Sequence, residues 1–278
     1  MVGGTVLNKP WKVSVIGAGK MGEAIISGLL KSGVYNPQDI EVAEVIENRR
    51  KYIAHTYNVK CHEEGKEAVA FGDVVIIAVE PGAVAKVLEQ IGSSIKPGKV
   101  LVSIAAGITL GFLRKHLPEA VPVVRVMPNL ACSVREAIIA LCKSENTTEE
   151  ELKMATDVLG LLGRIIPLDE KYLNLATGLV GSGPAYIFLV IDALADAGVR
   201  LGIPKGLSTL LAAQTTLGAA KMVVETGEHP AKLKDMVATP AGTTVEGLLE
   251  LERGKLRATI ISAVTKAALR AKELLPAA

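Results

Sequence analysis

The chain has 278 residues, and 49% of them are hydrophobic, so it can bury the cores of two domains of ordinary size. Its 31 basic residues nearly balance 29 acidic ones, and no basic run favours a nucleic acid or a membrane surface as partner. The apolar run Val74 to Val79 is far shorter than the roughly 20 residues that a bilayer requires, and residues 1–10 lack the pattern of a secretory signal. We therefore expect a cytoplasmic protein without a transmembrane helix, whose partners are small molecules or further copies of itself.

The three cysteines form an odd set without CxxC spacing, which argues against a disulfide framework and a zinc site. A catalytic cysteine needs a histidine partner, and the four histidines are scattered along the chain without a recognisable pairing. We expect reduced, packed thiols and no metal. The residues concerned are Cys61, Cys132, Cys142, His55, His62, His116 and His229.

Up to Pro167, short β-branched apolar runs alternate with stretches of helical spacing, which is typical of a mostly parallel sheet covered by helices on both faces. Two later runs can extend the sheet edge, and Thr147–Leu162 between them predicts a helix with a capping box formed by Thr147 and Glu150. The predicted strands are Lys12–Ile16, Ile40–Val45, Val74–Val79, Val100–Ser103, Val121–Val126, Ala137–Cys142 and Ile165–Leu168.

Beyond about Asp169 the strand patterns stop, and glycine- and proline-containing breakers separate helix-like segments. These segments are apolar on more than one face, which predicts burial against a second copy of the chain. The sequence thus predicts an α/β protein, with a mostly parallel sheet in residues 1–168 and an all-helical C-terminal domain in residues 169–278. The predicted helices are Lys171–Leu201, Lys205–Thr226, Pro230–Val237, Thr243–Glu252 and Lys255–Leu274.

The first predicted strand runs directly into a GxGxxG turn and then a helix, Glu23 to Lys31. Gly17 permits the tight turn, Gly19 lets a pyrophosphate approach the backbone, and Gly22 lets the helix pack closely on the strand. The helix N-terminus offers free N–H groups to the phosphates. This order of elements predicts a Rossmann-type dinucleotide site, since an ordinary glycine-rich turn does not require it. The residues assigned to the cofactor here are Gly17, Ala18, Gly19, Lys20, Met21 and Gly22.

Glu44 stands near the end of the second predicted strand, roughly 20 residues after the loop, where an acidic side chain binds the ribose 2′-hydroxyl of NADH. A 2′-phosphate at this position faces like-charge repulsion, so Glu44 favours NADH. Arg49 and Arg50 follow closely and could swing back to bind a phosphate, which leaves NADPH open. A solvated carboxylate at the strand end is the alternative without a ligand.

Several further motifs resemble those of pyrroline-5-carboxylate reductases, in the order of that family and over residues 13–273. Two of them, the RVMPN and GSGPAY blocks, are specific enough to make a chance match remote. The motifs are Ala78–Pro81, Val102–Gly107, Arg125–Asn129, Thr177–Tyr186 and Thr239–Thr244.

The resemblance implies a Rossmann domain followed by a helical domain that forms a homodimer or a larger homo-oligomer. It also implies NAD(P)H as cofactor, with NADPH usual in the family, and 1-pyrroline-5-carboxylate as substrate. The residues implied to contact the cofactor are Ala78, Val79, Glu80, Pro81, Ala105, Ala106 and Asn129, and those implied to contact the substrate are Ser182, Gly242, Thr243 and Thr244.

The chain departs from the family pattern at several positions. Glu80 stands where relatives usually have lysine, Val45 where an arginine commonly binds the 2′-phosphate, and Ala241 where they have glycine. Val180 replaces a serine, and Leu130 and Ala131 replace a Thr-Pro pair. These changes place a strict NADPH preference in doubt, while the fold and the class of reaction are unaffected.

Two of the implied substrate segments also admit readings without a ligand. Thr243 and Glu246 have capping-box spacing, so the helix start can either bind a small carboxylate or simply be capped. The segment Gly181–Pro184 is either an interruption of the helix with effects on packing alone or a close approach of the backbone to the substrate.

The implied reaction transfers hydride from the nicotinamide to the C=N carbon of the cyclic imine and gives L-proline. A protonated imine is already electrophilic, so no residue is assigned as an obligatory proton donor. One alternative is a β-hydroxyacid dehydrogenase, although Lys171, Lys205 and Lys221 all lack the glycine-led context of its catalytic lysine. The other alternative is a dinucleotide-sensing protein without turnover.

Overall fold

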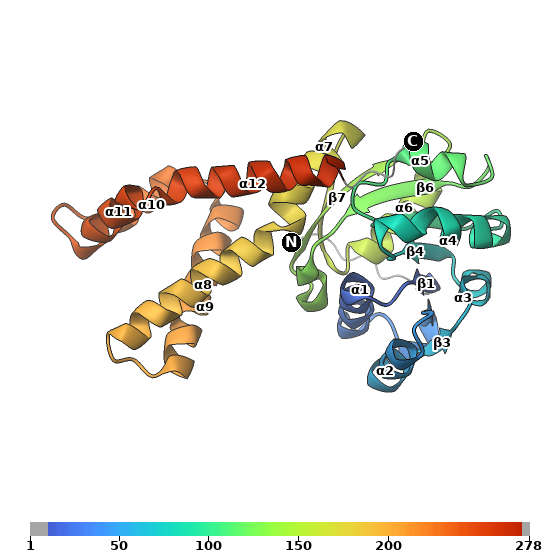
Figure 1. Ribbon diagram of the computed structural model, residues 1–278, viewed down its shortest axis with the longest axis horizontal. Coiled ribbons are helices and arrows are strands. Elements are labelled where there is room, and N and C mark those ends of the chain that lie inside the picture. Colours follow the sequence, from blue (N-terminus) through green and yellow to red (C-terminus); the bar gives the residue numbers. More distant parts are fainter. Residues whose placement is uncertain (1–10, 274–278) are drawn as a thin grey trace. The chain divides into compact units, whose positions relative to one another are not determined.

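A computed structural model describes residues 11–273, and its central feature is an eight-stranded sheet with the order β3-β2-β1-β4-β5-β6-β7-β8 (Figure 1). All neighbouring strands are parallel except β6 and β7, which are antiparallel. The mostly parallel sheet expected from the alternating pattern is therefore confirmed. The strands are β1 (Val13–Ile16), β2 (Ile40–Ala43), β3 (Lys60–His62), β4 (Val74–Ile77), β5 (Val100–Ser103), β6 (Val123–Met127), β7 (Ala137–Lys143) and β8 (Gly163–Pro167).

Helices cover both faces of this sheet, so the side chains of its central strands are buried on both sides. On one face, α1 and α6 pack over the central strands, and α3, α4 and α5 pack over the other face. The α-helices from the start of the sheet to the one that follows β8 are α1 (Lys20–Lys31), α2 (Glu47–Tyr57), α3 (Gly65–Phe71), α4 (Val84–Ile91), α5 (Leu110–Lys115), α6 (Glu149–Leu159) and α7 (Glu170–Ala176). Short 3₁₀ turns are η1 (Pro37–Asp39), η2 (Pro81–Ala83), η3 (Gly92–Ser94) and η4 (Leu130–Val134).

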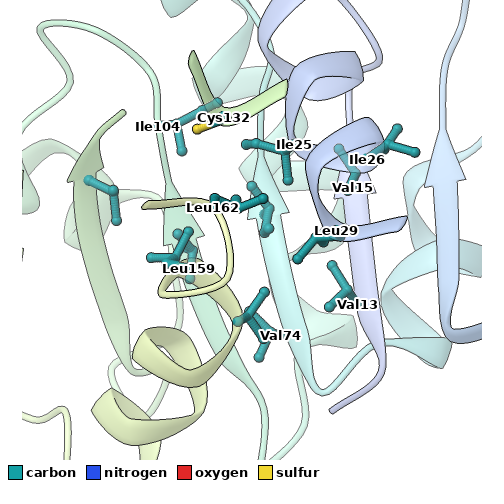
Figure 2. Close-up of a cluster of buried hydrophobic side chains, with 14 of the residues drawn as sticks. Val13, Val15, Ile25, Ile26, Leu29, Val74, Ile104, Cys132, Leu159 and Leu162 are labelled. Carbon is teal, nitrogen blue, oxygen red and sulfur yellow. The ribbon is translucent and has the colours of Figure 1, made fainter. Parts of the chain in front are cut away.

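The larger core cluster lies between α1 and the first strands of the sheet. Figure 2 shows Ile25, Ile26 and Leu29 of α1 beside Val13 and Val15 of β1, and all five side chains are fully buried. Burial of each such side chain contributes about 1.5–3 kcal/mol. This packing fixes the start of α1 against the carboxyl end of β1, where the glycine loop lies.

The remaining helices form a second compact unit, residues 183–266, while residues 267–273 belong to the sheet unit. The predicted boundary after residue 168 stays a prediction. The helices are α8 (Gly183–Arg200), α9 (Lys205–Thr226), α10 (Pro230–Val237), α11 (Thr243–Arg253) and α12 (Leu256–Glu273). Within this unit α8 and α9 form a hairpin, in which the hydroxyl of Ser208 donates to the carbonyl of Ala195 at 2.6 Å.

The structure corrects three local predictions. The first capping box is formed by Thr148 and Glu151, one residue later than expected. The helix predicted over Lys171–Leu201 is interrupted by a π-helical turn, η5 (Thr177–Gly181). The edge strand β3 was not predicted, because its sequence Lys-Cys-His carries no apolar run. The predicted end of the last helix at Leu274 lies outside the described residues, as do residues 1–10.

Candidate active site

The glycine loop between β1 and α1 has the conformation that its sequence predicts. Gly17 has a φ of +94°, and its N–H donates to the carbonyl of Ala43 at 2.8 Å. A Cβ at Gly17 would lie 2.7 Å from Cγ1 of Val79, and a Cβ at Gly22 would collide with the carbonyl oxygen of Gly17. The turn and close packing predicted for these two glycines are therefore confirmed.

Gly19 differs from both of them, because a Cβ there would meet no atom within 4 Å. It is the N-cap of the 12-residue helix α1 and forms no side-chain cap. The first N–H groups of the helix therefore have no side-chain cap, and the helix start carries a partial positive charge. This geometry fits the pyrophosphate of a dinucleotide, although its occupation by a cofactor stays a prediction.

A cavity of about 610 Å³ opens beside this loop, at the carboxyl ends of β1, β2 and β4. Ligands of open α/β sheets bind at this edge. Six of the predicted cofactor residues line the cavity: Gly17, Gly19, Glu44, Ala78, Val79 and Glu80.

The other predicted cofactor residues lie outside this lining. Ala105 and Ala106 follow β5, and Asn129 follows β6, so they mark the carboxyl ends of the next strands in the sheet. This is the direction in which the family resemblance places the nicotinamide, and the assignment stays a prediction. Ala18, Lys20, Met21 and Gly22 belong to the loop and the first turn of α1, and Pro81 begins η2.

Two parts of the cavity lining were not predicted from the sequence: residues 63–66 and the side of α4 that faces the cavity. Residues 63–66 follow β3, so they could not be assigned to the sheet edge while that strand was unrecognised. The polar run from Glu63 to Lys66 offers no apolar signal that would have revealed it. The lining residues of α4 and its approach are Ala83, Val87, Gln90 and Ile91.

Glu44 borders the cavity with a buried side chain, 8% exposed. One carboxylate oxygen accepts the N–H of Ala18 at 2.9 Å, and the other accepts the N–H of Ile46 at 3.0 Å. The carboxylate therefore holds the glycine loop as well as the turn after β2, and is not the freely solvated group of the alternative reading. Each oxygen keeps a lone pair with which it can accept a hydroxyl.

Both arginines that could bind a phosphate are engaged elsewhere. Arg49 donates from Nε to the carbonyl of Ala18 at 2.6 Å and pairs with Glu23 at 2.5 Å. Arg50 donates to the carbonyl of Glu44 at 2.7 Å and pairs with Glu63 at 3.0 Å. Moving either guanidinium to a 2′-phosphate requires breaking an ion pair together with a hydrogen bond to the backbone.

The cavity is lined by more negative than positive side chains. Glu44, Glu63, Glu64 and Glu80 contribute carboxylates, and Lys66 contributes the ammonium group. Val45, which replaces the family's common arginine, also lines the cavity and is 76% exposed. A preference for a ligand with hydroxyl groups over one with an additional phosphate stays a prediction.

Ser182 directly follows the π-helical turn and belongs to the sheet unit. Its N–H donates to the carbonyl of Thr177 at 3.0 Å, which closes the wide turn. The thiol groups offer no rival nucleophile, because burial raises the pKa of Cys61, Cys132 and Cys142 to about 11. Among residues 11–273, no group of three or more His, Cys, Asp or Glu side chains could hold a metal ion.

The predicted carboxylate site lies at the start of α11, in the helical unit. The N-cap of α11 is Gly242, so the capping box predicted for Thr243 and Glu246 is wrong. The N–H of Val245 donates to the carbonyl of Gly242 at 3.2 Å, and without a side-chain cap the N–H groups of Thr243 and Thr244 remain for another partner. Ala241 immediately before it has a φ of +57°, a left-handed conformation that glycine adopts more readily.

The helical unit exposes many large apolar side chains. Two stretches, Glu170–Arg200 and Lys205–Thr226, are long and apolar enough to span a membrane by length and composition, with mean hydropathies of 1.6 and 1.2. By length and composition alone such helices are weak evidence of a membrane span, so the expectation of a chain without a transmembrane helix stays a prediction. Polar residues interrupt both stretches, so a search for uninterrupted apolar runs does not find them. On α8 and α9 the exposed side chains include Phe188 (59%), Leu189 (71%), Leu210 (63%) and Val224 (66%).

Comparison with known proteins identifies related families for the N-terminal part of the chain and for its helical C-terminal part. The family described as pyrroline-5-carboxylate reductase dimerisation matches residues 170–274, and the one described as NADP oxidoreductase coenzyme F420-dependent matches residues 12–107. Residues 170–274 therefore carry a dimerisation domain. Homo-oligomerisation accounts for the exposed apolar side chains of this part of the chain.

Similar proteins of known name match nearly the whole chain. A pyrroline-5-carboxylate reductase of Arabidopsis thaliana is 44% identical over 95% of this chain and 95% of its own, and one of Methanosarcina acetivorans is 41% identical over 95% and 97%. The crystal structure of a Plasmodium falciparum pyrroline carboxylate reductase with NADP bound is 28% identical, covers 96% of this chain and 98% of its own, and has a TM-score of 0.87. The chain therefore belongs to the pyrroline-5-carboxylate reductase family.

Proposed function

We propose that this chain reduces the C=N bond of 1-pyrroline-5-carboxylate and so forms L-proline in the cytoplasm, with NADH as its preferred cofactor. The observation that carries the proposal is the cavity beside the uncapped start of α1, in a chain that resembles named reductases over nearly its whole length. The reduced nicotinamide, when bound, supplies the hydride.

The residues of the chain bind and orient the reactants. We assign the pyrophosphate to the loop from Gly17 to Gly22, and the adenosine ribose to the region of Glu44. We assign the remaining path toward the nicotinamide to the predicted residues that follow β4, β5 and β6. Catalysis then depends on holding donor and acceptor in register, which accounts for a site without an assigned proton donor.

We assign the substrate carboxylate to Gly242, Thr243 and Thr244, because the helix start there lacks a side-chain cap. The ring nitrogen and its proton are assigned to Ser182, whose hydroxyl can both donate and accept. Exposed apolar side chains of the helical unit support a homodimer built through that unit, or a larger assembly of such dimers. Nothing in the charge of the chain favours a nucleic acid or a membrane as a partner.

The preference for NADH follows from the charges around the cavity. A 2′-phosphate near Glu44 meets a buried carboxylate, and the two neighbouring arginines are already paired with Glu23 and Glu63. A 2′-hydroxyl instead donates a hydrogen bond to the same carboxylate. The experiment measures the resulting difference in kcat/KM between NADH and NADPH.

The test is steady-state oxidation of NADH and NADPH with 1-pyrroline-5-carboxylate, in the wild type and in Glu44→Ala. We expect kcat/KM to be higher with NADH in the wild type, and the ratio of the two values to fall about tenfold in the variant, which corresponds to about 1.4 kcal/mol. Absolute activity falls with both cofactors, because Glu44 also holds Ala18 and Ile46. The ratio of kcat/KM with NADH to kcat/KM with NADPH is therefore the quantity that tests the role of Glu44 in cofactor choice.

Glu64→Ala is the matched control, since it removes a carboxylate of the same cavity that is exposed to solvent. We expect it to keep the ratio within about twofold of the wild type, because an exposed charge is screened. A wild type that prefers NADPH, or an unchanged ratio in Glu44→Ala, contradicts the cofactor proposal. Dinucleotide binding without turnover contradicts the enzymatic proposal and favours a sensing protein.

A further inference from the structure

Arg125 is a buried charge that the proposed reaction does not use. It lies in the middle of β6 and is 1% exposed, and it belongs to the RVMPN block. Its neighbours in register are Ser103 on β5 and Cys142 on β7. A guanidinium at such a depth is costly unless charged and polar partners compensate for the lost water.

Those partners lie one helical turn apart on α7. Nη1 of Arg125 donates to Oε1 of Glu170 at 2.9 Å, and Nη2 donates to Oδ1 of Asn174 at 2.5 Å. The same oxygen of Glu170 accepts the N–H of Leu110 at 2.6 Å, which ties in the start of α5. The planar guanidinium thus holds α7 at two points, and a lysine could not reproduce this geometry.

The next turn of the chain is fixed by the same strand. Thr177 begins the π-helical turn that follows α7, and its hydroxyl lies 3.8 Å from the sulfur of Met127, two residues beyond Arg125 on β6. Gly181 ends this turn, and a Cβ there would lie 3.7 Å from the same sulfur. The segment from Glu170 to Ser182 is therefore attached to β6 through both Arg125 and Met127.

This attachment runs from the middle to the end of β6, the strand that leads to Asn129, one of the residues assigned to the cofactor. We propose that Arg125 is a positioning residue for the reduction: its contacts with Glu170 and Asn174 set the position of the π-helical turn and therefore of Ser182. The inference rests on the proposed function, because it takes Ser182 to contact the substrate.

Asn174→Ala is the sharpest test, because it removes one contact of the guanidinium and keeps the ion pair with Glu170. Alanine also favours the helix, so α7 should persist. We expect faster amide hydrogen exchange in residues 177–182, and a kcat lower by about tenfold, because misplaced reactants slow the chemical step. The KM for NADH stays within about twofold, and the isotope effect on kcat with 4-deuterated NADH increases.

Two variants separate positioning from damage to the fold. Asn174→Asp restores an oxygen acceptor for Arg125, so we expect exchange and kcat to return to within about threefold of the wild type. Lys171→Ala changes an exposed side chain on the same helix, whose ion pair is with Asp169, and we expect neither quantity to change. A lower fraction of folded protein reduces kcat without altering the isotope effect.

The outcomes distinguish this inference from the proposed function. A wild type without turnover overturns the proposed function together with the inference. Turnover by the wild type, combined with an Asn174→Ala variant of unchanged exchange, kcat and isotope effect, overturns the inference alone. Loss of activity in Asn174→Ala that Asn174→Asp does not restore also overturns it.

Discussion

The two units of this chain bury their apolar side chains to very different degrees. In the sheet unit, α1 has seven buried residues among twelve, and the central strands are buried on both faces. In the helical unit, Ala195 alone is buried among the 18 described residues of α8, and none is buried in α11. The sheet unit therefore has a core of its own, whereas the helical unit depends on a second copy to cover its apolar side chains.

The difference also separates two kinds of binding feature. Around the cofactor cavity, backbone geometry is set by a packed core, with glycines wherever a Cβ would collide or φ is positive. At the predicted carboxylate site, the left-handed position is occupied by Ala241, in a unit with few buried side chains. We infer that assembly is needed to hold the second site in place, while the first site forms within one chain.

The largest effect is expected from a charge in the apolar surface of the helical unit. Leu189→Glu places a carboxylate at a side chain that is 71% exposed in the single chain. If a second copy covers this position, the burial of an unpaired charge disfavours association by several kcal/mol. We expect monomers by sedimentation velocity at concentrations where the wild type is a dimer, together with loss of turnover.

Val134→Glu is the control in the sheet unit, where the side chain is 62% exposed and lies at the end of η4. We expect this variant to assemble like the wild type. A dimeric Leu189→Glu variant, or a monomeric Val134→Glu variant, removes the distinction between the two units.

The next effect separates two glycines of the same loop. Gly22→Ala collides with the carbonyl of Gly17, so we expect a loss of about 1–3 kcal/mol in the free energy of unfolding. Gly19→Ala meets no protein atom, and we expect unfolding to change by less than about 0.5 kcal/mol, while the KM for NADH rises about tenfold. Urea denaturation and steady-state kinetics on both variants test the contrast, which fails if Gly19→Ala leaves the KM unchanged.

The sequence predicted the sheet well because its central strands are continuous apolar runs, and burial on both faces requires such runs. The strand β3 was missed because an edge strand of three residues needs few apolar side chains. The glycine loop and Glu44 could be placed because their spacing follows from the backbone geometry of the motif. The ion pairs of Arg49, Arg50 and Arg125 could not be predicted, because they join side chains that are 26, 13 and 45 residues apart in the sequence.

The helix boundaries show a similar limit. The range of α9 was predicted to the residue, since Pro204 and Gly227 mark its two ends. The π-helical turn at Thr177–Gly181 was not predicted, because its distinguishing feature is a shifted hydrogen bond, from Ser182 N–H to the carbonyl of Thr177, to which the apolar pattern is insensitive.

The smallest effect concerns a partly buried carboxylate that links α1 and α2 in the sheet unit. Burial raises the pKa of Glu23, but hydrogen bonds from Arg49, Tyr57 and Tyr52 outweigh it, so its pKa lies below the ordinary value of 4.5. A group with a lowered pKa stabilises the folded state fully above its unfolded value, and this contribution is lost as the pH falls through the folded value. We expect Glu23→Gln to lower the free energy of unfolding by about 1 kcal/mol at pH 7.

The difference between Glu23→Gln and the wild type should begin to shrink near pH 4.5 and continue to shrink as the pH falls further, because the wild-type carboxyl then becomes protonated as well. Glu47→Gln is the control, since its ion pair with Lys51 is exposed on both sides and screened by solvent. We expect this variant to have the same free energy of unfolding as the wild type in urea denaturation, both at about pH 7 and below about pH 4.5. A loss in Glu23→Gln that is independent of pH would mean that the side chain acts by packing and not by its charge.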